Sequence, residues 1–369
     1  MTVEINKEDI FRLAKKLCET PSPSGFESKI REVLIEEIRD YVDELWIDSM
    51  GNLIAKKAGQ GEGKVMIAAH MDEIGLMITN IDKNGFLRFV PVGGWSPRIL
   101  PAQRVLIRTI DGNTVHGVIG IKPPHIEKPE ERQKVIPLEN LFIDIGVTSD
   151  EEAKKLGIEV GSIAVIESTV ERLGNPDVIT GRAFDDKIGV VTAVETLKVL
   201  EDSKVDAYFV FTVQEEVGLK GARTAAFSIN PDIGIAIDVT IAADVPGTPE
   251  HAKIVKLGKG PAIKVMDGRA GSGLIAHPAI RDLLIAVAKE EKIPYQLEVL
   301  PGGTTDASAI QITREGIPAG AISIPTRYIH SPIEIVHLED VTNAVKLLAK
   351  AIKKVDSAWI NNVLRRRIK

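Results

Sequence analysis

Features that would place this chain in a membrane or outside the cell are scarce in its sequence. Among 369 residues there is one cysteine, Cys18, so no disulfide can form within the chain, which suits a reducing compartment. No long uninterrupted run of apolar residues predicts a transmembrane helix, and the first residues lack the apolar core of a signal peptide. We therefore expect a cytoplasmic protein with no membrane partner.

Positive charge and aromatic side chains are also in short supply. The formal net charge is −6 at pH 7, which argues against an electrostatically bound partner such as nucleic acid. Aromatic residues make up only 4% of the chain, which is little for a sugar-binding platform. Asparagine and glutamine are rare while charged residues reach 27%, a balance that favours a thermophilic source.

What the sequence does contain is an alternation of strand and helix patterns that is interrupted once. A chain of 369 residues is longer than one domain with a single hydrophobic core usually is, so two domains are expected. Residues 76–168 hold short β-type runs separated by Gly, Pro and Asp-Gly turns, which predicts an inserted small domain like a β-barrel. In residues 1–75 and 169–369, strands alternate with helices. This alternation predicts a discontinuous α/β domain with a mostly parallel mixed sheet covered by helices on both faces.

Three apolar strand patterns, ending near residues 69, 213 and 237, stop at acids or at a histidine. In an open α/β sheet, the carboxyl ends of parallel strands meet at one edge and present side chains to a ligand. We therefore expect these side chains to lie close together. They are His70, Asp72, Glu215, Glu216 and Asp238.

Two more candidates lie outside the strand ends. Asp185 stands beside Asp186 at the start of a predicted helix, where one acid suffices for capping and the other is free to bridge two cations. His330 follows the predicted strand Ala319–Ile324 in the segment Tyr-Ile-His-Ser-Pro. Together with the strand-end residues they supply two imidazoles and several carboxylates, a ligand set that two divalent metals share.

Each candidate also has an ordinary structural explanation. A buried histidine commonly hydrogen-bonds to a neighbouring acid, paired aspartates cap helices, and adjacent glutamates occur in solvated loops. An aspartate after a strand often forms an Asx-turn, and a lone histidine is more often structural than a ligand. All of these explanations would have to hold at once on one edge of one sheet, so the joint pattern favours a metal site.

These segments together resemble the tetrahedral, or TET-type, aminopeptidases. These are cytosolic dinuclear metallopeptidases, in a group that includes chains labelled deblocking aminopeptidase or endoglucanase. The resemblance covers nearly the whole chain and implies a zinc-aminopeptidase-like fold. It implies that residues 1–75 and 169–369 form the peptidase domain and that residues 76–168 serve dimerisation or assembly. The segments that carry it are Ala-Ala-His70-Met-Asp-Glu-Ile-Gly, Gly-Arg-Ala-Phe-Asp185-Asp-Lys, Gln-Glu215-Glu216-Val-Gly-Leu-Lys-Gly, Ile-Asp238 and Tyr-Ile-His330-Ser-Pro-Ile-Glu.

The resemblance also implies roles for the site residues. His70, Asp185 and Asp238 would hold one metal, and His330, Asp185 and Glu216 would hold the other, so that Asp185 bridges the two. A mixed imidazole and carboxylate set suits Zn²⁺ or Co²⁺ better than Mg²⁺ or Ca²⁺.

Two residues outside this ligand set are expected to act on the chemistry. Glu215 would be the general base for a water activated by the two metals, and Asp72 would be the partner of His70. The loop around residues 302–306 resembles one beside the active site of the family, although a turn leading into a helix explains it equally well. The substrate-pocket candidates are Lys264, Gly303, Thr304 and Asp306.

The expected function is thus a metal-dependent aminopeptidase that releases N-terminal residues from short peptides. The resemblance further implies a homo-oligomer in which dimers assemble into a dodecamer. Two alternatives remain open. A glycosidase, endoglucanase-like, would also use paired carboxylates but would not need His70 or His330. A non-catalytic assembly scaffold would keep the peptidase fold without its activity.

Overall fold

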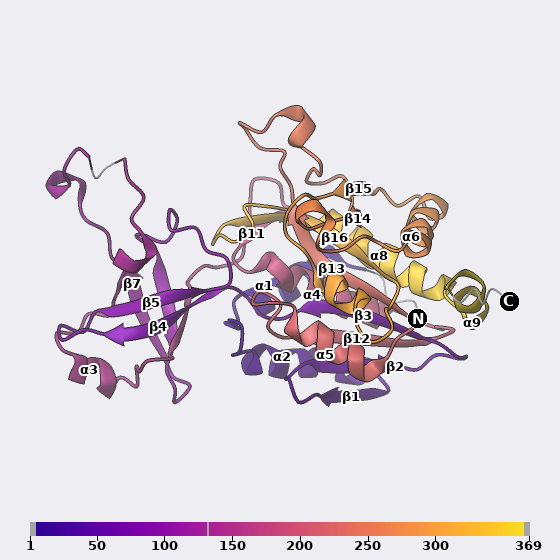
Figure 1. Ribbon diagram of the computed structural model, residues 1–369, viewed down its shortest axis with the longest axis horizontal. Coiled ribbons are helices and arrows are strands. Elements are labelled where there is room, and N and C mark those ends of the chain that lie inside the picture. Colours follow the sequence, from indigo (N-terminus) through magenta and orange to yellow (C-terminus); the bar gives the residue numbers. More distant parts are fainter. Residues whose placement is uncertain (1–4, 131–132, 365–369) are drawn as a thin grey trace.

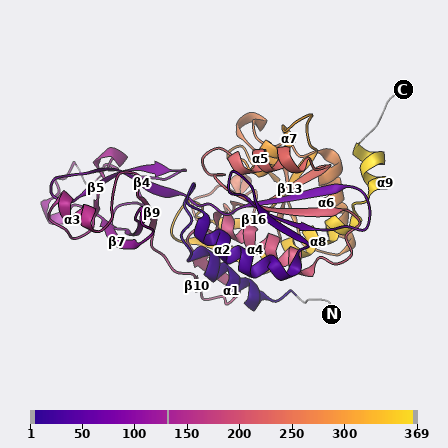
Figure 2. The ribbon, with the colours of Figure 1, turned by 90° about the horizontal axis from the view of Figure 1, so that it is seen from below.

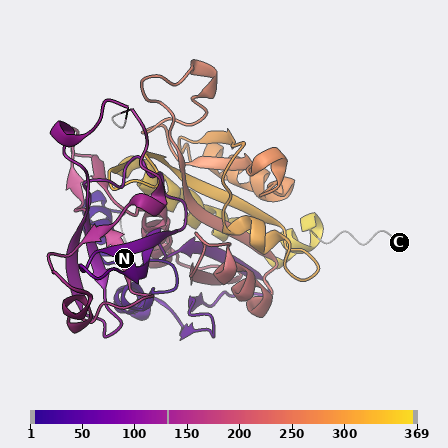
Figure 3. The ribbon, with the colours of Figure 1, turned by 60° about the vertical axis from the view of Figure 1, so that its left-hand side comes forward.

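The computed structural model describes residues 5–130 and 133–364 and has two bodies joined along its long axis (Figure 1). The larger body is an α/β unit, and the smaller one is built mainly of antiparallel strands. Figure 3 shows the smaller body from its own side, with the larger one behind it. This arrangement confirms the predicted fold class.

The larger body is built on a mixed sheet of eleven strands whose centre is parallel. Its principal order is β1-β2-β12-β3-β13-β16-β17-β11-β10, with β14 and β15 attached beside β16. Strands β12, β3, β13 and β16 run parallel to one another, and the pairings at either edge are antiparallel. The strands are β1 (Glu44–Ile47), β2 (Leu53–Lys57), β3 (Lys64–His70), β10 (Glu171–Arg172), β11 (Val178–Gly181), β12 (Asp206–Thr212), β13 (Ile233–Ile241), β14 (Ala262–Met266), β15 (Gln296–Val299), β16 (Ala319–Arg327) and β17 (Glu334–His337).

Helices cover both faces of this sheet (Figure 2). Alternate residues of β3 show the division, because Val65 and Ile67 belong to one apolar core while Met66 belongs to a second. Helices α1, α2, α4, α6 and α8 pack on the first core, and α5 and α7 pack on the second. The helices are α1 (Lys7–Cys18), α2 (Ser28–Ile38), α3 (Asp150–Lys155), α4 (Phe184–Val199), α5 (Lys220–Ile229), α6 (Pro278–Glu290), α7 (Asp306–Gln311), α8 (Leu338–Lys354) and α9 (Ser357–Trp359).

Helix α1 illustrates how the sequence specifies these elements. The side chain of Asn6 caps the helix by accepting a hydrogen bond from the backbone N–H of Glu8. Acids occupy its first turn and lysines its last, which suits the helix dipole. Its buried residues, among them Ile10, Leu13 and Leu17, recur at helical spacing and bury one face against the core.

The smaller body is a closed barrel with the strand order β4-β5-β8-β7-β6-β9. It has its own apolar core, in which Leu76, Phe89 and Ile107 are buried, and α3 lies on its side (Figure 1). The barrel lies in the chain between β3 and β10, so it interrupts the α/β unit as expected from the sequence. Its strands are β4 (Gly75–Ile81), β5 (Leu87–Val92), β6 (Arg104–Arg108), β7 (Thr114–Ile119), β8 (Ile143–Asp144) and β9 (Ile163–Ile166).

Within the described part of the chain, no helix has both the length and the apolar character needed to span a membrane.

The single cysteine provides a test of how tightly the first core is packed. Cys18 ends α1 with a fully buried side chain, and burial raises the pKa of its thiol to about 12. Because thiolate is the reactive form, we expect Cys18 to resist an alkylating agent at about pH 8 in the folded protein and to react after denaturation. Mass spectrometry of both samples would measure this. Complete labelling of the folded protein within minutes would contradict the packing described here.

Candidate metal centre

Neighbouring strands bring most of the predicted site residues to one edge of the sheet. Strand β3 ends at His70, and Glu215 and Glu216 follow β12 after a short turn. Asp238 lies within β13, which continues to Ile241, so it precedes the end of its strand by three residues. The shared edge follows from the parallel order of β12, β3 and β13.

The imidazole of His70 is surrounded by carboxylates. Its Nε2 atom lies 3.2 Å from Oδ1 of Asp185, 3.7 Å from Oε2 of Glu215 and 3.9 Å from Oδ1 of Asp238. His70 is only 2% exposed, so these groups meet with little water between them. The opposite nitrogen, Nδ1, lies 3.1 Å from the carbonyl oxygen of Asp72 and 3.6 Å from its carboxylate.

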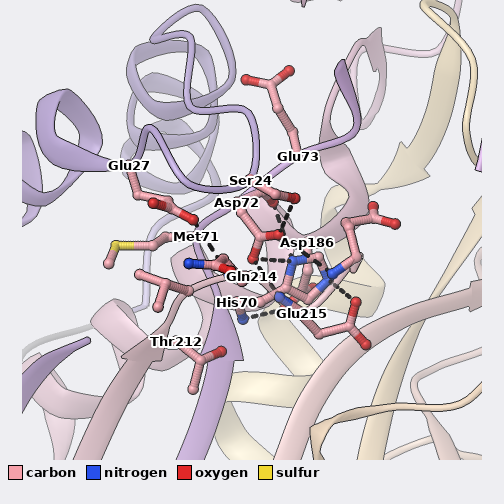
Figure 4. A network of polar contacts seen from close by, with 12 residues as sticks. Ser24, Glu27, His70, Met71, Asp72, Glu73, Asp186, Thr212, Gln214 and Glu215 are labelled. Carbon is pink, nitrogen blue, oxygen red and sulfur yellow. Dashed lines mark hydrogen bonds and ion pairs between the residues drawn. The ribbon is translucent and has the colours of Figure 1, made fainter. Parts of the chain in front are cut away.

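The carboxylate of Asp72 also fixes the turn that carries the two glutamates (Figure 4). Its Oδ1 accepts the backbone N–H of Glu215 at 2.9 Å, and its Oδ2 accepts the backbone N–H of Glu216 at 3.3 Å and the hydroxyl of Ser24 at 2.6 Å. Asp72 therefore sets the positions of His70 and of both glutamates at the same time.

His330 approaches from the other side of Asp185. Its Nε2 lies 3.3 Å from Oδ2 of Asp185 and 3.3 Å from Oε2 of Glu216. Its Nδ1 is 2.8 Å from the carbonyl oxygen of Gly94, a residue between β5 and β6 of the barrel. The two oxygens of Asp185 thus face two different histidines, which is the arrangement expected of a carboxylate that bridges two cations.

The site carries more negative charge than its histidines can balance. Burial and neighbouring carboxylates raise the pKa values of Glu215, Glu216 and Asp238, although His70 or His330 opposes the rise. Burial opposes protonation of His330, but hydrogen bonds to Asp185 and Glu216 outweigh it and raise the pKa of His330 to about 11. Divalent cations would relieve this repulsion, because they neutralise carboxylates that burial penalises.

The donor atoms fit metal ions in type and spacing. Two groups of three, in each of which the ligand atoms lie within 4.8 Å of one another, occur in the described residues. One consists of His70, Glu215 and Asp238, and the other of His70, Asp185 and Glu216. The Oε1 atom of Glu216 is buried without a hydrogen-bond partner, which leaves it available as a ligand. Imidazole nitrogen with carboxylate oxygen is a set that suits zinc and similar ions.

A cleft of about 760 Å³ opens over these residues, a size suited to a small ligand. Lys264, Gly303 and Thr304, three of the candidates for the substrate pocket, are among the residues that line it. Asp306 does not lie on its wall. It begins α7, and its buried carboxylate accepts the hydroxyl of Thr212 at 2.6 Å.

Residues 51–347 match the family model described as M42 glutamyl aminopeptidase. The chain belongs to this family. Members of this family are metal-dependent hydrolases, typically with two metal ions. Together with its named relatives, this membership identifies the chain as an aminopeptidase.

Three relatives show how similar this chain is to other aminopeptidases. An aminopeptidase from the archaeon Desulfurococcus kamchatkensis is 50% identical, with a TM-score of 0.95 over 98% of this chain and 99% of that one. The TET1 peptidase of Pyrococcus horikoshii, described as able to assemble into a tetrahedron or a large octahedral shell, is 38% identical, with a TM-score of 0.84 over 94% of this chain and 100% of that one. The lysyl aminopeptidase of Pyrococcus furiosus is 41% identical over 346 residues, or 93% of this chain and 96% of the relative.

Three buried acids to which the sequence analysis assigned no role at the metal centre support the M42 site. Glu334 accepts the backbone N–H groups of Phe184 at 2.6 Å, Asp185 at 3.2 Å and His330 at 2.8 Å. Asp186, joined to Asp185 by a cis peptide bond, accepts the backbone N–H of His70 at 3.3 Å. Both acids stand directly within the quoted motifs, so an acid flanking a candidate ligand was the available signal.

Glu73, next to Asp72, is the third buried acid. It forms ion pairs with Arg182 and, at 2.7 Å, with Lys187, and all three side chains are at most 5% exposed. Removing one member of such a buried group costs about 3–5 kcal/mol, because it leaves the partner charges uncompensated. This cluster ties the turn after β3 to the segment that leads into Asp185.

Glu334→Gln tests whether this acid positions the metal-binding residues. The amide replaces one acceptor oxygen with a donor that faces backbone N–H groups, so we expect the affinity for Zn²⁺ or Co²⁺ to fall by about 10–100-fold. Metal content after dialysis against graded chelator concentrations would measure it.

Glu339→Gln is the matched control, because Glu339 is a partly exposed residue of α8 paired with Lys7. It should bind metal like the wild type. If Glu334→Gln also retained wild-type affinity, Glu334 would have no part in holding the site.

Proposed function

We propose that this chain is a dinuclear metallo-aminopeptidase that releases N-terminal residues from short peptides, with Glu215 as general base. The observation that supports the proposal most strongly is the position of Asp185, with one oxygen 3.2 Å from Nε2 of His70 and the other 3.3 Å from Nε2 of His330. A single carboxylate shared in this way is the natural link between two adjacent cations.

We assign the ligands as the motifs imply. His70, Asp185 and Asp238 would hold one cation, and His330, Asp185 and Glu216 would hold the other, with Zn²⁺ or Co²⁺ the best matched ions. When bound, the two ions would polarise the scissile carbonyl and lower the pKa of a bound water toward about 7. His330 is held for this role by the carbonyl oxygen of Gly94, and His70 by that of Asp72.

Glu215 is the candidate general base because it stands beside the ligands with its backbone fixed. Asp72 accepts its N–H at 2.9 Å, and its carboxylate lies 3.7 Å from Nε2 of His70. Burial raises the pKa of this carboxyl group, which favours its holding a proton between two steps. Glu215 would take the proton of the attacking water and give it to the leaving amine.

The cleft would favour the selection of N-terminal residues. A free α-amine would be attracted to the carboxylates at the base of the cleft, whereas an internal peptide bond offers no such charge. Lys264, Gly303 and Thr304 would contact the substrate. Asp306 would contribute to the substrate pocket indirectly, since it is not on the cleft wall and is hydrogen-bonded to Thr212 at the end of β12.

We also propose separate roles for two parts of the chain. Residues 1–75 and 169–369 would form the catalytic domain, and residues 76–168 an inserted domain used for dimerisation. Homo-oligomers, with dimers assembling into a dodecamer, would match a related TET1 structure that is described as a dodecamer. We expect this assembly to work in the cytoplasm of a thermophile.

Metal removal separates this proposal from a glycosidase. Dialysis against EDTA should reduce the hydrolysis of an aminoacyl p-nitroanilide to background, and Zn²⁺ or Co²⁺ should restore it, because the histidines and carboxylates cannot activate water alone. A pair of glycosidase carboxylates would survive this treatment. Unchanged activity without metal would contradict the proposal.

Glu215→Gln tests the general base. We expect kcat to fall by about 10²–10⁴-fold, because the amide cannot accept the proton, while the metal content stays near that of the wild type. Steady-state assays and elemental analysis of the same preparation would measure both. Glu62→Gln, an exposed position before β3, is the matched control and should behave as wild type. Retained activity in Glu215→Gln would rule out this role.

A further inference from the structure

Three polar side chains form a closed set of contacts at one wall of the cleft. They come from three strands of the sheet, Thr240 from β13, Lys264 from β14 and Glu298 from β15, of which β14 and β15 are paired. The Nζ atom of Lys264 lies 2.9 Å from Oε2 of Glu298 and donates to the hydroxyl of Thr240 at 3.4 Å. That hydroxyl in turn donates to Oε1 of Glu298. Lys264 and Glu298 are also directly paired in the strand register.

The two charges are buried and compensate each other. Lys264 is 2% exposed and Glu298 is 0% exposed, so neither is neutralised by solvent. Asp267 is a second buried acid nearby, whose carboxylate accepts the backbone N–H of Leu274 and the hydroxyl of Thr304. The local balance therefore leaves no uncompensated positive charge.

This set belongs to the wall that a substrate side chain would meet. Lys264 and Thr240 line the cleft together with the ligand-bearing residues His70, Asp185 and Asp238. Apolar side chains line the cleft as well. They are those of Leu219, Val239, Ile241, Leu300, Tyr328 and Ile329. A buried lysine on such a wall would recognise a carboxylate only if its own partner were absent.

We propose that Glu298 masks Lys264, so that the cleft selects uncharged apolar N-terminal residues over acidic or basic ones. The inference rests on the proposed aminopeptidase function and specifies its substrate class. It departs from the names of this chain's relatives, since the family model is described as glutamyl and the Pyrococcus furiosus enzyme as lysyl.

The physical basis is the cost of competing with a buried pair. An acidic substrate side chain would have to displace Glu298 from a 2.9 Å contact, or remain desolvated beside two buried acids. A basic side chain would have to enter beside the like charge of Lys264. An apolar side chain meets neither penalty and gains the burial of its surface.

The first test uses the wild-type enzyme loaded with Zn²⁺ or Co²⁺. Leucyl, glutamyl and lysyl p-nitroanilides share one leaving group, so the ratios of their kcat/KM values report the N-terminal side chain alone. We expect leucine to exceed both charged residues at least tenfold. A preference for glutamate or lysine would overturn the inference. Failure to cleave any substrate would instead count against the aminopeptidase proposal.

Glu298→Gln tests the masking itself. Removing the carboxylate exposes the charge of Lys264, so the ratio of glutamyl to leucyl kcat/KM should rise at least tenfold. Glu291→Gln is the matched control, because Glu291 pairs with Lys350 away from the cleft and its loss should leave the ratio unchanged. An unchanged ratio in a folded Glu298→Gln variant would overturn the inference.

A double variant guards against misfolding, because a lone buried charge is destabilising. Lys264→Met combined with Glu298→Leu removes both charges, and thermal melting would show whether it folds. Its ratio of glutamyl to leucyl kcat/KM should stay within about threefold of the wild-type value. A tenfold rise there, with no lysine present, would show that loss of the Glu298 carboxylate admits an acidic side chain without any unmasking of Lys264, and would overturn the proposal.

Discussion

The site depends on one carboxylate held between two imidazoles. Asp185 offers one oxygen to His70 and the other to His330, although these histidines lie 260 positions apart in the chain. Such crowding of buried polar groups is costly unless each is fixed by donors of its own or neutralised by cations. Much of the surrounding structure supplies those donors.

The supporting contacts come from several parts of the fold. Glu334 accepts three backbone N–H groups and so joins the start of α4 to the segment after β16. Asp72 likewise accepts the backbone N–H groups of Glu215 and Glu216 and so fixes the turn that carries them. The barrel contributes as well, since the carbonyl oxygen of Gly94 faces Nδ1 of His330. The inserted barrel thus helps to hold a residue of the site, His330, in position.

Charge is treated differently on the two sides of the cleft. Around His70 the acids outnumber their partners, so the pKa values of several are raised and the site is suited to cations. The positive charge of Lys264, by contrast, is paired with a single carboxylate, that of Glu298, at 2.9 Å. The first arrangement attracts cations, and the second leaves no free positive charge for a substrate to contact. This contrast follows from which strands lie next to each other, because β14 and β15 pair in register at Lys264 and Glu298.

The sequence by itself determined the alternation of strands and helices, the interrupting barrel, and the acids and histidines at the strand ends. Those features are local, because burial of a strand and the polarity of the next residue are written in consecutive positions. Only the tertiary structure decided that Glu334 supports Asp185 and His330, that Asp306 lies beneath the cleft, and that Glu298 compensates Lys264. Each of these depends on residues from separate segments meeting in space, and a periodic pattern carries no information about which segments meet.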